Sequence, residues 1–119
     1  RADAIADGTL VDVSETAREA GFRVPVALTQ TVWGDCVSWG PDADLGACHQ
    51  DEAGRLWDVL WMARLAGSAN KDADRVAFKV LRVPRGSRTG QATPVTLLLD
   101  IGPGDQGEPV VTIGLAEDF

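Results

Sequence analysis

The densest group of side chains that could do chemistry lies mid-chain, at Cys48, His49, Asp51 and Glu52. Thiolate, imidazole and carboxylate groups are the usual ligands of zinc, and Cys36 lies twelve residues upstream. A structural zinc site takes four ligands, usually arranged as closely spaced Cys or His pairs, and the chain has no such pair. We therefore expect no metal and no other cofactor.

Two catalytic arrangements are also conceivable. A nucleophilic cysteine needs an imidazole within hydrogen-bond reach and a third group to orient it, and Cys48/His49 lacks an evident third group. Asp58 lies inside the strongest helical pattern, where burial would raise its pKa and make it an acid–base candidate. A long helix also needs a polar face, so an outward Asp58 is the favoured interpretation. A small enzyme using Asp58 or Cys48/His49 is thus an alternative, and a non-enzymatic protein is preferred.

Trp57 and Trp61 stand one helical turn apart. Such a pair either packs a helix onto a sheet or forms an exposed aromatic platform for a partner. Core packing is the more common explanation of this spacing. An exposed pair would indicate an interaction surface.

The charge of the chain is unevenly distributed. The net charge is −7 over 119 residues, yet residues 61–88 hold seven of the eleven bases and only two of the eighteen acids. An acidic protein is a poor general binder of nucleic acid, because phosphate neutralisation supplies most of that affinity. The basic segment Arg75–Arg88, with Arg82, Arg85 and Arg88, keeps a nucleic-acid-associated accessory protein open as an alternative.

The hydrophobic pattern changes period along the chain. It predicts helices over 2–7, 14–20, 29–39 and 55–66, with short extended stretches at 10–13 and 24–28. Alternating apolar residues then predict strands at about 75–83, 94–101 and 109–115. The Gly-Pro-rich segment 102–107 is a hairpin turn, since it precedes a strand and lacks the Lys-Ser/Thr ending of a phosphate loop.

We therefore expect a single α+β domain spanning residues 1–119. Its core would be a three-stranded antiparallel β-meander, because short connections exclude parallel pairing between consecutive strands. An N-terminal helical layer would pack on one face of that sheet. No apolar run reaches the ~20 residues that a membrane span needs, and no signal peptide is visible. With two cysteines only, a cytoplasmic location is expected.

Seven blocks of sequence, spread over nearly the whole chain, form a recognisable set: residues 4–8, 11–14, 20–22, 25–29, 54–63, 82–86 and 101–110. Together they resemble a family of small uncharacterised bacterial proteins, domain of unknown function 6573. The resemblance implies a bacterial mobile element, such as a plasmid, an integrative element or a phage, as the context. It carries over no catalytic or binding residue.

The most consistent function is a non-enzymatic accessory or interaction protein of such an element, acting on a host protein. Anti-defence action is the specific hypothesis, made by analogy of context. The expected interaction surface is the border where the charge changes sign, near the tryptophan helix. Its residues are Trp57, Trp61, Asp58, Arg82, Arg85 and Arg88.

Overall fold

A computed structural model describes residues 1–40 and 50–119 of the chain. The chain begins with helix α1 (Ala2–Asp7), strand β1 (Leu10–Asp12), helix α2 (Ser14–Glu19) and strand β2 (Val26–Thr29). The short helix α3 (Gln30–Val32) runs directly into one turn of π-helix, η1 (Trp33–Val37). After the longest helix, α4 (Glu52–Ala69), come strands β3 (Arg75–Arg82), β4 (Thr93–Pro103) and β5 (Pro109–Gly114), and the 3₁₀ turn η2 (Ala116–Asp118).

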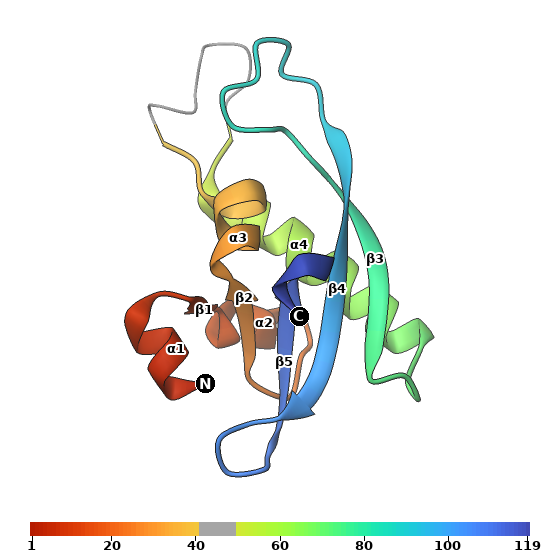
Figure 1. Cartoon of the computed structure of the whole chain (residues 1–119). Coiled ribbons are helices and arrows are strands. Elements are labelled where there is room, and N and C mark those ends of the chain that lie inside the picture. Colours follow the sequence, from red (N-terminus) through yellow and green to blue (C-terminus); the bar gives the residue numbers. More distant parts are fainter. Residues whose placement is uncertain (41–49) are drawn as a thin grey trace.

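The strands form one five-stranded mixed sheet in the order β1-β2-β5-β4-β3 (Figure 1). Strands β3, β4 and β5 pair antiparallel in sequence, and β1 pairs antiparallel with β2. Strand β2 joins the two parts by pairing parallel with β5, with Val26 opposite Val111. Parallel strands need a long crossover, and here α3, η1, α4 and two strands of the sheet lie between them.

The α+β class is confirmed, but the expected three-stranded sheet is too small. The sequence indicated that residues 10–13 and 24–28 are extended, and the structure places β1 and β2 in the same sheet as the later strands. All four residues of β2 are buried, as is typical of an interior strand covered on both faces. The four residues of β2 show no alternation of apolar and polar side chains. The position of β2 within the sheet therefore could not be predicted from the hydrophobic pattern.

Helices α2 and α4 and the turn η1 cover one face of the sheet (Figure 1). Leu60 of α4 is fully buried in this core, which also contains Cys36 of η1 and Ala17 of α2. The sheet contributes apolar side chains from its four longer strands. These are Val26, Leu28, Phe78, Val80, Leu97, Leu99, Val111 and Ile113.

The opposite face of the sheet is held by the two ends of the chain. The Arg1 guanidinium donates to Thr112 Oγ1 at 2.9 Å and to the Val111 carbonyl at 2.8 Å. Near the other end, the Asp118 carboxylate accepts from Thr29 Oγ1 at 2.8 Å, and the Phe119 ring lies under the Arg75 guanidinium. Polar and aromatic contacts therefore take the place of a second helical layer.

Local signals explain where the helices begin. Thr29 caps α3 by accepting a hydrogen bond from the Val32 amide, as its residue type indicates. Asp51 caps α4 by accepting from the Gly54 amide at 2.6 Å, so α4 starts three residues before the predicted Arg55. Ser14, an expected N-cap, instead opens α2, and its amide donates to Asp12 Oδ1.

The burial of α4 gives a direct test of the fold. Leu60 is fully buried, whereas Leu65 on the same helix is 44% exposed. We expect Leu60→Ala to lower the free energy of unfolding by about 2–5 kcal/mol, because it leaves a cavity between helix and sheet. The matched control Leu65→Ala should change it by less than about 0.5 kcal/mol. Urea unfolding measures both, and equal effects would contradict this packing of α4.

Candidate functional site

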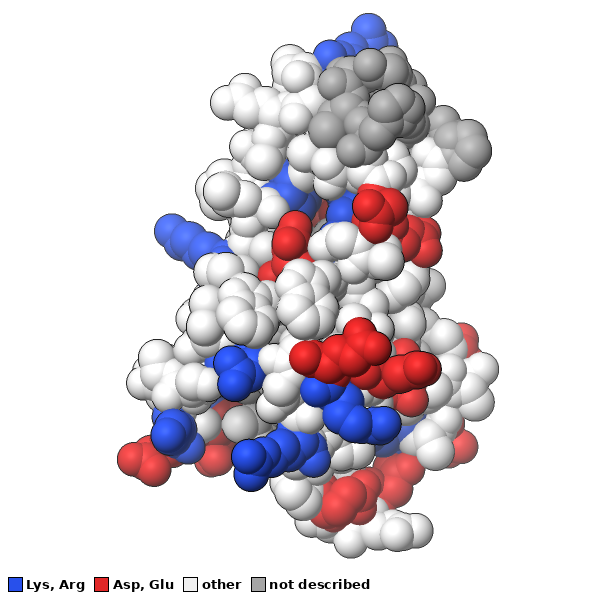
Figure 2. Space-filling view, turned by 180° about the vertical axis from the view of Figure 1, so that it is seen from behind, with Lys and Arg blue, Asp and Glu red and all other residues white. Residues whose placement is uncertain are grey.

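Trp57 and Trp61 lie on the outer face of α4. They are 37% and 40% exposed, and their rings stack with centroids 5.9 Å apart and planes inclined by 13°. The structure therefore decides between the two readings of this pair in favour of the exposed platform. Figure 2 shows an uncharged area across the middle of this face, with both acidic and basic side chains above and below it. Paired exposed aromatic rings are unusual on a protein surface and are typical of interfaces.

A groove beside the tryptophans extends the apolar surface toward the sheet. Trp61 and Met62 of α4 line one side, and Leu81 of β3 and Pro94 of β4 line the other. Its volume is about 390 Å³. Leu81 is 66% exposed, although it is a large apolar side chain in a strand. The groove lies along one edge of the sheet, because β3 is the outermost strand of the sheet on that side.

Asp58 lies between the tryptophans in sequence and is exposed, as the polar-face interpretation expects. It lines the apolar groove together with Lys79, and it also lines a smaller pocket with Arg82 and Cys36. Within the described residues, Asp58 takes part in no ion pair or hydrogen bond. Its carboxylate is therefore available to a ligand or partner next to the stacked rings.

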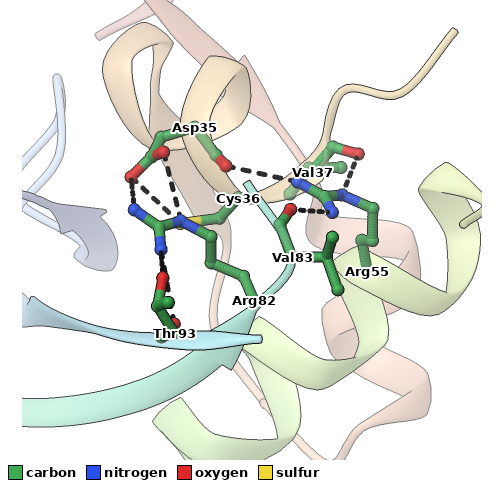
Figure 3. A network of polar contacts seen from close by, with 7 residues as sticks. All are labelled: Asp35, Cys36, Val37, Arg55, Arg82, Val83 and Thr93. Carbon is green, nitrogen blue, oxygen red and sulfur yellow. Dashed lines mark hydrogen bonds and ion pairs between the residues drawn. The ribbon is translucent and has the colours of Figure 1, made fainter. Parts of the chain in front are cut away.

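Arg55 lies at the start of α4 and is 4% exposed (Figure 3). Its guanidinium donates to three backbone carbonyls: Val37 at 3.0 Å, Val83 at 2.8 Å and Asp35 at 3.2 Å. It also lies 4.8 Å from the centre of the Trp39 ring. Burial lowers the pKa of Arg55, but an arginine stays protonated at neutral pH. This side chain joins α4 to η1 and to the residue that follows β3.

Arg82 makes a second polar link, between β3 and η1. Its Nε lies 3.2 Å from Asp35 Oδ1 and its second nitrogen 3.3 Å from Oδ2, which is a bidentate pair. The remaining nitrogen donates to Thr93 Oγ1 at 2.6 Å (Figure 3). Asp35 belongs to the π-helical turn, a form that is rare and frequent at functional sites. Arg82 is thus engaged inside the protein.

Cys36 lies behind this pair and is almost completely buried. Burial raises the pKa of its thiol to about 11, with the nearby Asp35 carboxylate acting in the same direction. A thiol of this kind is not ionised near neutral pH, so Cys36 is a packing residue and no nucleophile.

The structure brings only part of the predicted surface together. Trp57, Trp61 and Asp58 share one face of α4, and Arg82 reaches the pocket beside Asp58. Arg85 and Arg88 are exposed in the connection between β3 and β4, and neither lines the groove or the pocket. Cys48 and His49 lie outside the described residues. Among the residues that are described, no cluster of three His, Cys, Asp or Glu side chains could hold a metal ion.

Sequence reasoning missed Asp35 and Arg55 as partners in this region. Both are charged residues that stand directly beside core residues in the sequence. Because charged side chains are rarely buried without a partner, a charge at such a position could have indicated an internal polar contact. Their contacts span 18 to 47 positions of the chain. A pattern within one helix cannot show such partners.

The model of a family described as a family of unknown function (DUF6573) matches residues 1–119. The chain belongs to this family. No curated protein and no solved structure matches this DUF6573 protein. Over the described residues, its helices are too short or too polar to cross a membrane.

The role of Arg55 in this DUF6573 protein is testable by substitution. In Arg55→Lys the charge is kept, but a single ammonium group cannot reach all three carbonyls that the guanidinium joins. We expect the free energy of unfolding to fall by about 3 kcal/mol, because buried carbonyls lose their donors. Arg18→Lys, an exposed change on α2, is the control and should shift it by less than about 0.5 kcal/mol. A urea midpoint for Arg55→Lys equal to that of the parent would refute the role.

The raised pKa of Cys36 predicts slow alkylation. In a Cys48→Ser variant, Cys36 is the remaining thiol of the chain. At pH 8 its pKa of about 11, against an ordinary value of 9.0, leaves roughly a hundredfold less thiolate. We expect iodoacetamide to react at least about a hundredfold more slowly with the folded variant than with the same variant in urea. Comparable rates in the two states would show that Cys36 is accessible and ionised.

Proposed function

We propose that the chain is a non-enzymatic accessory protein that binds a host protein through the outer face of α4. The observation that carries this proposal is the exposure of the stacked Trp57/Trp61 pair next to an apolar groove. Aromatic residues of this kind supply most of the binding energy in many interfaces. The bacterial mobile-element setting, the cytoplasmic location and an anti-defence role are parts of the same proposal, and they rest on the family resemblance.

The chemistry around the tryptophans favours a basic partner. Asp58 is exposed beside the rings and has no ion pair within the described part of the chain. Arg64 already lies over the Trp61 ring, 5.6 Å from its centre, so this ring accepts a guanidinium on its face. Because Trp61 already contacts both Arg64 and Trp57, an arginine or lysine of the partner would pair with the exposed Asp58 carboxylate next to the stacked rings. The net charge of −7 would steer such a partner toward the protein.

A nucleic-acid partner is the weaker proposal, because two arginines of the basic segment form ion pairs within the protein. Within the basic segment, Arg75 lies 3.1 Å from Asp100 and Arg82 lies 3.2 Å from Asp35. These two cations are therefore compensated by carboxylates of the same domain, which reduces their attraction for phosphate. The small-enzyme proposal around Asp58 has less support still, because the thiol that lines its pocket, Cys36, is not ionised near neutral pH.

The binding proposal is tested with the double variant Trp57→Ala/Trp61→Ala. Immobilised parent protein should retain a host protein that elutes as salt rises to about 0.5 M, where surface charge is screened. The double variant should bind the purified partner at least about thirtyfold more weakly, the effect of losing about 2 kcal/mol at an aromatic hot spot.

Phe119→Ala is the matched control, since it removes a ring that is 43% exposed on the opposite face of the sheet. It should retain the partner as the parent does. Equal retention by the tryptophan variant would overturn the assignment of this surface. Loss of the captured protein after nuclease treatment would instead support the nucleic-acid alternative.

A further inference from the structure

A second hollow lies where the connection between α2 and β2 meets the C-terminal half of α4. Its volume is about 310 Å³. Leu99, Ile101 and Val111 of the sheet form an apolar floor, and Phe22 and Val24 line it from the connection. An apolar floor of this size can cover the hydrocarbon part of a small ligand.

The charged residues that line this hollow are all basic. They are Arg23, Arg64 and Lys71, and no carboxylate is among the lining residues. In the part of the chain that the structure describes, neither Arg23 nor Lys71 forms an ion pair. Figure 2 shows several basic side chains on the lower half of this face of the molecule, with acidic side chains above and below them. Three cations without a carboxylate are unexpected in a protein whose acids outnumber its bases by eighteen to eleven.

Arg64 is held in place by its surroundings. Its guanidinium lies over the Trp61 ring, and its side chain runs against the backbone of Gly21. A Cβ at position 21 would overlap Arg64 Nε, and the φ of +107° at Gly21 is itself a conformation that favours glycine. The glycine therefore makes room for the arginine at the rim of the hollow. A cation fixed in this way loses little conformational entropy when it binds an anion.

We propose that this hollow binds a small amphipathic carboxylate. Its apolar body would lie on the floor formed by Leu99, Ile101 and Val111. Its carboxylate would lie at the rim, where Arg64 supplies a planar pair of donors and Arg23 and Lys71 add positive charge. A ligand without the anionic group would leave the cations unpaired, and an anion without the apolar body would leave the floor exposed to water. The site adjoins the tryptophan surface through Arg64, which lies over the Trp61 ring, but the proposal does not rest on the function proposed for that surface.

Three probes separate the parts of this proposal: octanoate, acetate and octanol. Titration followed by calorimetry and by tryptophan fluorescence should show saturable binding of octanoate, with Trp61 reporting because Arg64 lies on its ring. Acetate and octanol should each bind at least about tenfold more weakly, because each lacks half of the complementary chemistry. Octanol binding as tightly as octanoate, or octanoate failing to saturate, would overturn the proposal.

Variants locate the binding. Arg64→Gln and Lys71→Gln should each weaken octanoate binding, the first by about tenfold or more, because a charge-assisted hydrogen bond is lost. Arg18→Gln removes an exposed arginine of α2 that does not line the hollow. The affinity of this variant for octanoate should therefore stay within about twofold of that of the parent. Circular dichroism establishes that each variant is folded. Unchanged affinity in both Arg64→Gln and Lys71→Gln, or equal loss in Arg18→Gln, would place the carboxylate elsewhere.

Discussion

The buried guanidinium of Arg55 sets the position of α4 relative to the rest of the domain. A charged group that is 4% exposed must find partners inside the protein, and Arg55 finds them in carbonyls of η1 and of the residue after β3. The donors of a planar guanidinium point in fixed directions. The three hydrogen bonds therefore constrain how the start of α4, the turn η1 and the end of β3 lie relative to one another. The neighbouring pair of Arg82 with Asp35 ties the same turn to the sheet. With its first turn fixed, α4 can bury one stripe against the sheet and present the other to solvent.

This orientation of α4 creates both the exposed tryptophan surface and the hollow lined by basic residues. The outward stripe carries the stacked tryptophans toward the edge strand β3. The C-terminal half of the helix carries Arg64, and the turn after it carries Lys71, to the hollow beside β4 and β5. One helix thus separates an apolar groove, lined also by Asp58 and Lys79, from a hollow whose charged residues are all basic. The two surfaces differ in chemistry because the exposed Asp58 lies in the first half of α4, whereas Arg64 lies in its second half and Lys71 follows the helix.

The local parts of the fold could be predicted because their signals are local. Alternation in 75–83, 94–101 and 109–115 predicted strands that the structure has at Arg75–Arg82, Thr93–Pro103 and Pro109–Gly114. The parallel pairing of β2 with β5 could not be predicted, because it joins segments that are separated by most of the chain. For the site, the sequence singled out Trp57, Trp61 and Asp58, but it could not give Arg55 and Asp35 as the residues that hold the helix in place.

By itself, the sequence determined the α+β class, the helix caps at Thr29 and the hairpin between β4 and β5, since each depends on residues close together in the chain. It also determined that one segment is basic and that the flanking segments are acidic. Only the tertiary structure decided that the tryptophans are exposed, since either face of a helix can pack on a sheet when both carry large apolar residues. It also decided that Arg82 is paired internally, because the carboxylate that neutralises it lies 47 positions away in the chain.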